Sequence, residues 1–274
     1  MKKNIIIKPK QSIDLIEDIK EMWEFKDLFY FLTWRDLKVR YKQTMIGIAW
    51  ALFQPFTTMV VFTIFFGNLA KMPSDGVPYP IFVYTGLLLW QFFSDSLGET
   101  SNCLIANNSI ITKVYFPRLI LPISATITKF VDFFIASTIL IALMAYYGYL
   151  PQIKGILILP LLLFITFIAA IGIGLILASI NVKYRDVRYI LPFFINLLLF
   201  LTPVIYPSSI AGKYSKILAL NPMTGVIKAA RAAILGNAPI NWLLLLISGI
   251  ASFILLAIGI IFFKKIERHF ADII

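Results

Sequence analysis

The chain has 274 residues, of which 59% are hydrophobic and 14% are charged. A soluble domain usually carries about 25% charged residues, so this composition excludes an ordinary water-soluble domain and predicts a polytopic membrane protein. The formal net charge of +11 does not indicate a nucleic-acid partner, because the basic residues stand at the ends of apolar segments, where they orient a protein in its membrane.

Residues 1–44 are predicted to be a cytoplasmic N-terminal region. Ser12 can cap a helix that begins at Ile13, and in this helix apolar side chains recur at helical spacing opposite an acidic face. The pattern predicts an amphipathic helix that lies in the membrane interface or packs against a partner. The region mixes acids and bases without an apolar core, so it is not a signal peptide.

Residues 45–274 are predicted to form one transmembrane domain of six helical spans, which makes the fold class all-α. The first span is the clearest, because charge stops at Lys42 and is absent between positions 45 and 67. A segment of that length can cross about 30 Å of hydrocarbon. The spans are placed near 45–70, 80–106, 119–147, 156–181, 189–206 and 241–263.

The distribution of Lys and Arg predicts that both termini are cytoplasmic. Six crossings place both termini on one side of the membrane, and the segments on that side hold 18 Lys and Arg residues against six on the other. Cytoplasmic segments carry such an excess of basic residues.

The segment between the last two spans, residues 207–240, is too polar and too often broken to cross a membrane. Residues 210–220 and 223–235 are each predicted to be a short external helix, separated by Asn221-Pro222 and stopped by Gly236-Asn237. Two interpretations stay open: a gate over a transport pathway, or a pair of interfacial helices that anchor the loop.

Four ionisable residues fall inside predicted spans. Asp95 and Glu99 share a helix face and are interpreted as lying near the cytoplasmic end of their span, where a carboxylate reaches water. An acid–base or cation-holding role is the alternative. Lys129 and Asp132 are expected to pair with each other, although an ionisable pair within a span also suggests a functional site.

A row of small residues, Ala170, Gly174 and Ala178, lies on the fourth span. Such rows let helices approach closely. The row is expected to pack within the chain or to form the seam of a homodimer.

The sequence contains no nucleotide-binding loop of either glycine-rich pattern, G-x-x-x-x-G-K-[ST] or G-x-G-x-x-G. The single His269 and the single Cys103 exclude a zinc site built from His and Cys, a Ser-His-Asp triad and an internal disulfide. No catalytic residue, cofactor site or metal site is therefore predicted.

Aromatic side chains are abundant, with 24 Phe, 12 Tyr and 5 Trp, and many fall inside spans. An aromatic-lined tunnel would suit a sugar polymer, because the apolar faces of sugars can slide over rings; otherwise the rings face lipid or the core. Residues 110–115, between the second and third spans, can form one or two helical turns. These turns would be exposed to the cytosol and could bind in a groove of a partner protein.

Five segments together resemble the permease subunit of ABC-2 type polysaccharide exporters, which move O-antigens, capsular polysaccharides or teichoic acids. They follow one another in the family's order through nearly the whole chain. They read RDLKVRYKQTMIGIAWALFQP (35–55), YTGLLLWQFFSDSL (84–97), ITKVYFPRLILP (111–122), NVKYRDVRYILPFFINLLLFLTPVIYP (181–207) and LNPMTG (220–225).

The resemblance implies a homodimer of permeases that pairs with two copies of a separate ABC ATPase subunit. ATP and Mg would bind to that partner, so this chain would be a transport subunit without its own cofactor. The location would be the bacterial cytoplasmic (inner) membrane, and the substrate a lipid-linked polysaccharide. The N-terminal amphipathic helix would be an interface helix, and the two external helices would be gate helices that dip into the membrane.

The resemblance also implies three sets of site residues. A coupling helix that docks on the ATPase would comprise Ile110, Ile111, Thr112, Lys113, Val114, Tyr115 and Phe116. A tunnel between the two permeases would be lined by Trp90, Phe93, Phe194, Phe200 and Tyr206. An anionic lipid headgroup would first meet the protein at Arg35, Arg40 and Lys42.

Three other functions stay open from the sequence: an ABC-2 permease for a small amphiphile or drug, a stand-alone channel or secondary transporter, and an intramembrane transferase. The channel needs an ionisable path through the spans, and only Lys129 and Asp132 lie clearly in mid-span. The transferase lacks a catalytic cluster.

Overall fold

The computed structural model describes residues 15–42, 47–184, 186–210, 218–236 and 238–267. Every long element in these ranges is a helix, and the described residues contain no strand. The prediction of an all-α fold is confirmed. The predicted N-terminal cap, Ser12, lies outside the described residues.

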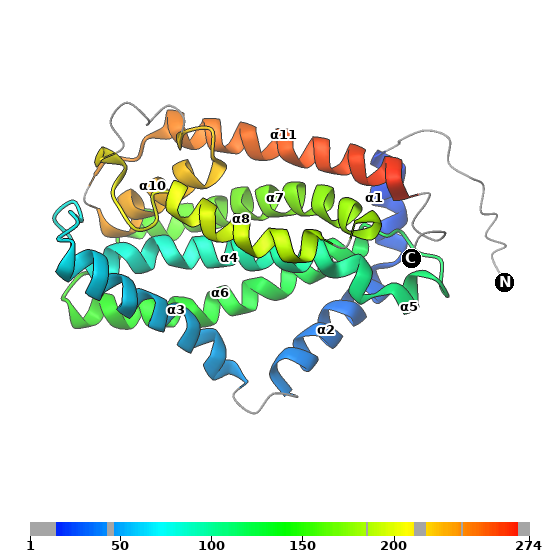
Figure 1. Ribbon diagram of the computed structural model, residues 1–274, viewed down its shortest axis with the longest axis horizontal. Coiled ribbons are helices and arrows are strands. Elements are labelled where there is room, and N and C mark those ends of the chain that lie inside the picture. The colour runs from blue at the N-terminus through cyan, green and yellow to red at the C-terminus, as the bar shows by residue number, and fades with distance from the viewer. Residues whose placement is uncertain (1–14, 43–46, 185, 211–217, 237, 268–274) are drawn as a thin grey trace.

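The long helices run side by side along the longest axis of the molecule (Figure 1). One end, called here the α5 end, carries α1, α2, α5 and the C-terminal end of α11; the opposite end, the α10 end, carries α10. The elements are α1 (Leu15–Glu24), α2 (Lys26–Lys42), α3 (Ile48–Phe62) continued by the π-helix η1 (Thr63–Leu69), α4 (Tyr79–Ala106), α5 (Asn108–Ile111), α6 (Ile120–Tyr146), α7 (Ile153–Lys183), α8 (Val187–Leu201), α10 (Pro222–Leu235) and α11 (Trp242–Glu267).

Four of the described helices are long and apolar enough to cross a membrane, namely α3 with η1, α6, α7 and α11. The helix α4 has 28 residues, or about 42 Å at 1.5 Å per residue, but Asp95 and Glu99 make it less apolar. The helix α8 has 15 residues. The structure thus contains a helix at each of the six predicted positions, and the number of crossings stays a prediction.

The predicted C-terminal end of the fifth span, near residue 206, is wrong. The helix α8 ends at Leu201, and Thr202 is extended. Pro203 is the physical reason, because a proline disfavours the helical conformation in the residue before it. Residues 202–206 therefore follow α8 as a non-helical segment.

The N-terminal region contains two helices rather than the one that the amphipathic pattern predicted. Asp18 of α1 pairs with Lys264 of α11 at 3.1 Å, so α1 packs on the end of the bundle. The second helix, α2, exposes Tyr30 and Trp34, whose rings stack with centroids 6.5 Å apart. Lys38 Nζ lies 5.3 Å from the Trp34 ring. Aromatic rings beside basic side chains are typical of a membrane interface.

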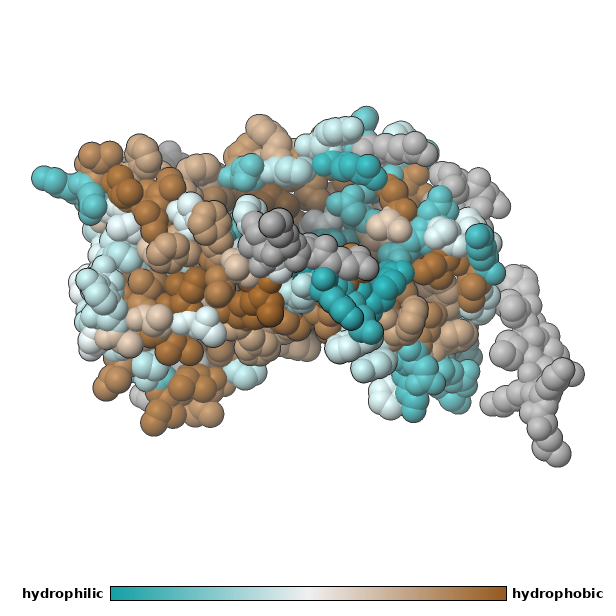
Figure 2. All heavy atoms as spheres, turned by 90° about the horizontal axis from the view of Figure 1, so that it is seen from below, coloured by the Kyte–Doolittle hydropathy of each residue, from teal (hydrophilic) through white to brown (hydrophobic). Residues whose placement is uncertain are grey.

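The helix α4 lies at the centre of the larger hydrophobic core, between α6, α7 and α10. Its residues Ile81, Phe82, Val83 and Tyr84 are completely buried. A second apolar cluster lies toward the α5 end and joins Leu32 of α2 to Phe263 of α11. Figure 2 shows apolar surface across much of the molecule, with hydrophilic residues gathered mainly toward the α5 end.

The row of small residues on α7 packs within the chain. Ala170 and Ala178 are completely buried, and a Cβ atom on Gly174 would lie 2.4 Å from the Thr100 side chain of α4. The intrachain interpretation is confirmed, and the homodimer seam is wrong for these residues. On another face of α7, a Cβ atom on Gly259 of α11 would lie 2.3 Å from the carbonyl oxygen of Gly172.

We expect Gly259→Ala to lower the thermal unfolding midpoint of the detergent-purified protein, because the added methyl group forces α11 away from α7. Gly249→Ala is the control on the same helix: its Cβ atom would meet nothing closer than 3.9 Å, and alanine favours helix over glycine. Equal midpoints for the two variants would contradict the close α7–α11 packing.

Candidate functional site

A groove of about 360 Å³ lies between α4 and α8 and is bounded on one side by α3. Its wall is unusually polar for an apolar bundle. The polar lining residues are Gln54 and Thr58 of α3, Gln91, Ser94, Asp95 and Asn102 of α4, and Arg188 and Asn196 of α8. Polar side chains inside a membrane bundle are costly unless they meet water or a polar ligand, so this polar groove is the candidate transport surface.

The polar face of α4 arises from spacing along the helix. Gln91, Asp95, Gly98 and Asn102 follow one another at intervals of three or four residues, which places them on one face. The Gln91 amide donates to the Asp95 carboxylate at 2.9 Å. Of the polar residues that line the groove, the sequence analysis singled out only Asp95 as a candidate; the same periodicity would have revealed the others.

A cluster of charges joins α2, α4 and α6 and comprises Arg40, Tyr41, Glu99, Lys129 and Asp132. The Arg40 guanidinium lies 2.7 Å from the Asp132 carboxylate, and Lys129 Nζ lies 2.7 Å from the Glu99 carboxylate. Tyr41 donates its hydroxyl to Asp132. Burial, together with that carboxylate, raises the pKa of the Tyr41 hydroxyl, so Tyr41 stays a donor.

The predicted ion pair between Lys129 and Asp132 is present, with the two side chains 3.9 Å apart. Each of them also has a closer partner: Glu99 for Lys129 and Arg40 for Asp132. Glu99 is half-exposed, which agrees with a carboxylate that reaches water, whereas Asp95 faces the polar groove. The charges of Lys129 and Asp132 are therefore balanced not only by each other but also by Glu99 and Arg40.

A cavity of about 30 Å³, with room for about one water molecule, lies against the charged cluster. Arg40, Lys129 and Asp132 line it together with Asp95. This charged cavity shares Gln54, Gln91 and Asp95 with the polar groove, so the two spaces adjoin.

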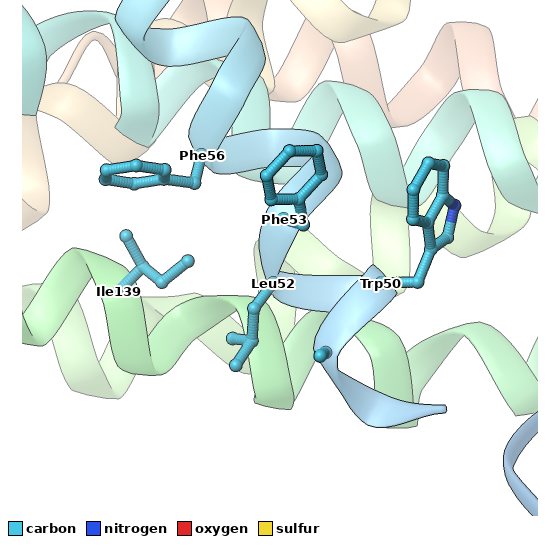
Figure 3. Close-up of a pocket in the computed structure, with 6 residues that line it drawn as sticks. Trp50, Leu52, Phe53, Phe56 and Ile139 are labelled. Atoms are coloured by element: carbon cyan, nitrogen blue, oxygen red, sulfur yellow. The ribbon is translucent and has the colours of Figure 1, made fainter. Parts of the chain in front are cut away.

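An apolar space of about 390 Å³, called here the apolar wedge, lies on the other side of α3. Figure 3 shows Phe53 and Phe56 of α3 facing Ile139 of α6 across it, with Leu52 and Trp50 along the same helix. Every residue that lines it is apolar. Trp50 lines both the wedge and the charged cavity.

The five aromatic residues predicted for a tunnel are not brought together within one chain. Trp90 and Phe93 are buried in α4, and Trp90 lines the polar groove. Phe194 and Phe200 of α8 are 53% and 56% exposed. Tyr206, in the segment after α8, is half-buried and donates to the Phe200 carbonyl at 3.2 Å. Their role in a tunnel between two chains stays a prediction.

The predicted coupling segment forms a shorter helix than expected. The helix α5 ends at Ile111, and residues 115–117 are not helical, in line with the tendency of proline to disfavour a helical residue before it. Ile111 and Phe116 are buried in the cluster at the α5 end. The remaining predicted coupling residues, Ile110, Thr112, Lys113, Val114 and Tyr115, are exposed or half-buried.

Tyr115 joins the coupling segment to the N-terminal region, because its hydroxyl donates to the Glu21 carboxylate at 3.0 Å. Of the residues predicted to meet a headgroup, Arg35 contacts Asp36 and Asn107, each at 2.7 Å. Arg40 belongs to the charged cluster, and Lys42 is exposed at the end of α2.

The helix predicted at 223–235 is confirmed as α10, and its external placement stays a prediction; most of its predicted partner at 210–220 lies outside the described residues. Arg231 of α10 is buried and donates to the carbonyls of Phe82, Pro203 and Val204. Its guanidinium lies 3.6 Å above the Phe82 ring. Arg231 is one of the six basic residues counted above on the side of the membrane opposite the termini, and its position within a run of alanines, AARAA, was the signal of burial.

Among the described residues, no three His, Cys, Asp or Glu side chains gather in a way that could hold a metal ion. The described side chains offer amide and hydroxyl hydrogen bonds in the groove, ion pairs in the cluster and apolar contact in the wedge.

We expect Arg231→Met to lower the unfolding midpoint in detergent by about 5 °C or more, because the Pro203 and Val204 carbonyls lose their donor at a cost of about 1–3 kcal/mol each. Lys228→Met is the control: Lys228 is half-buried on the same helix and should change the midpoint little. Arg231→Lys should be intermediate. A midpoint for Arg231→Met equal to that of Lys228→Met would contradict this role for Arg231.

Residues 27–235 match the family model described as ABC-2 type transporter. The chain is 30% identical to the O-antigen export system permease protein RfbA of Klebsiella pneumoniae, over 90% of this chain and 95% of that protein. It is 30% identical to the RfbA protein of Myxococcus xanthus, over 80% of this chain and 84% of that protein. It is 24% identical to the polysialic acid transport protein KpsM of Escherichia coli, over 73% of this chain and 78% of that protein.

Proposed function

The chain belongs to the ABC-2 type transporter family, and we propose that it is the permease subunit of an ATP-driven exporter of a lipid-linked polysaccharide. The observation that carries this proposal is the similarity to an O-antigen export permease over 90% of this chain and 95% of that protein. A match of that extent covers nearly the whole of both proteins rather than one shared segment. The protein is then a multi-pass protein of the bacterial inner membrane, with both termini in the cytoplasm.

The polar groove supports a carbohydrate substrate. Gln54, Gln91, Asn102 and Asn196 line the groove with amide groups, each of which carries two donor hydrogens and an acceptor oxygen. Gln91 uses one donor on Asp95 and Asn102 uses one on the Gly98 carbonyl. The remaining donors and acceptors match the hydroxyl groups of sugars without selecting one sugar. Phe194 lies on α8 between groove residues Pro192 and Asn196 and is exposed. In a homodimer, Phe194, Phe200 and Tyr206 complete an aromatic-lined tunnel against the second chain.

The partner that supplies energy is a separate ABC ATPase, in a complex of two permeases and two ATPases. This chain needs no cofactor, because ATP and Mg bind to that partner. The exposed part of residues 110–116 docks on it at the cytoplasmic face, and the Tyr115–Glu21 contact carries its movement to α1. At the same face, Arg35, Arg40 and Lys42 of α2 meet the anionic headgroup of the substrate.

Purification of the tagged protein from its native membrane tests this function. We expect an ABC ATPase in about equal amount, ATP hydrolysis by the complex, and loss of a surface polysaccharide from cells that lack the permease. A homo-oligomer without any ATPase, recovered from several detergents, would overturn the proposal and favour a channel or secondary transporter.

We expect the double variant Lys113→Ala, Tyr115→Ala to weaken ATPase binding roughly tenfold, since both side chains are exposed and their loss removes contacts rather than core packing. Tyr115→Phe is the matched control, because it removes only the hydrogen bond to Glu21. Co-purification of the ATPase at graded concentrations measures the effect. Unchanged binding in the double variant would remove this segment from the ATPase interface.

A further inference from the structure

The helix α3 separates two spaces of opposite chemistry. Gln54 and Thr58 line the polar groove on one side. Leu52, Phe53 and Phe56 line the apolar wedge on the other. A helix that divides a polar wall from an apolar wall suits a molecule with a polar and an apolar part, one on each side.

The apolar wedge, the charged cavity and the polar groove adjoin one another around α3, because neighbouring spaces share lining residues. The wedge shares Trp50 with the charged cavity, and the charged cavity shares Gln54 and Asp95 with the groove. The order across α3 is therefore apolar, charged and polar. A saccharide joined through phosphate to a hydrocarbon chain has the same three parts in the same order.

Basic side chains of α2 lie beside the junction, whereas the charged cavity itself is lined by two bases, Arg40 and Lys129, and two acids, Asp95 and Asp132. The C-terminal part of α2 carries Arg35, Lys38, Arg40 and Lys42 against the single acid Asp36. Arg40 lines the charged cavity, and an arginine binds carboxylate and phosphate with the same paired geometry. The charged cavity is too small for a phosphate, so the headgroup phosphate is placed outside it, where Lys42 is exposed at the end of α2.

The wedge is built from rigid, flat surfaces. Trp50, Phe53 and Phe56 are each more than two-fifths exposed, so their rings are available to an occupant. An isoprenoid chain, whose double bonds are fixed and whose methyl branches are bulky, loses less freedom on binding to such walls than a flexible acyl chain does. Once the headgroup and saccharide are held, binding of the tethered chain is intramolecular and needs no high affinity of its own.

We infer that the apolar wedge between α3 and α6 binds the isoprenoid chain of the substrate's lipid anchor while the saccharide occupies the polar groove. The inference rests on the proposed function, because it requires a lipid-linked saccharide as substrate.

A polyprenyl phosphate that carries a diazirine in its chain is the probe for the wedge. With the purified permease–ATPase complex in lipid nanodiscs, irradiation should label peptides that contain Phe53 or Ile139, and excess unlabelled polyprenyl phosphate should reduce that labelling at least fivefold. Excess phosphatidylglycerol should not. Absence of labelling there, or equal competition by phosphatidylglycerol, would overturn the inference, because the wedge would then hold only bulk lipid.

Ile139→Trp fills the wedge and should reduce polysaccharide export at least tenfold while ATPase co-purification and the unfolding midpoint stay unchanged. Ile254→Trp is the control, on the exposed face of α11, and should export normally. If Ile139→Trp fails to fold, labelling of the wild-type complex still decides the inference. Normal export by a folded Ile139→Trp variant would overturn it.

A second copy of the chain is the other possible occupant, and Phe53→Cys detects it. The native Cys103 is buried, so Phe53→Cys supplies the reactive thiol. A disulfide-linked dimer formed through Phe53→Cys in membranes would overturn the inference. These results differ from those expected if the proposed function itself were wrong. In that case the wild-type permease would purify without an ATPase, or cells that lack the permease would still export polysaccharide.

Discussion

Inside a bilayer no water is available to form hydrogen bonds with the backbone. Each carbonyl group beyond the end of a helix there needs a hydrogen-bond donor from the protein. The end of α8 creates this need at Pro203, Val204 and Ile205. Arg231 donates to the first two, and the Tyr79 hydroxyl donates to the third at 2.8 Å. The position of α10 against α4 and the end of the groove-lining helix therefore depend on one set of hydrogen bonds.

A second set of polar contacts organises the opposite half of the bundle. Arg40 connects α2 to α6 through Asp132, and Lys129 connects α6 to α4 through Glu99. The helix that carries the basic residues is thereby joined to the helices that flank the groove and the wedge. In these two pairs Lys129 and Asp132 are the more buried members, and removal of the partner of a buried charge is costly because that charge is left unpaired.

The elements could be predicted from the sequence because apolar runs and proline positions act locally. Pro203 even marked the end of α8, although hydropathy alone extended the span to residue 206. The site could be predicted less well, because its contacts join distant residues. Nothing local pairs Arg40 with Asp132, 92 positions away, and nothing local shows that Trp90 faces a groove while Phe93 faces the core. The polar periodicity of α4 was visible but was outweighed by its apolar residues. The alanines around Arg231 indicated burial, but its carbonyl partners on other elements depend on tertiary packing.

The pairing of Glu99 with Lys129 has a consequence for how the protein is made. The helix α4 leaves the ribosome before α6, with Glu99 still lacking the partner that lies 30 positions later in the chain. An unpaired carboxylate within a predicted span opposes insertion, by up to about 3 kcal/mol at the centre of the bilayer and by less toward its edge. The two helices are therefore expected to enter the bilayer as a hairpin, with α4 held beside the translocation machinery until Lys129 has been synthesised.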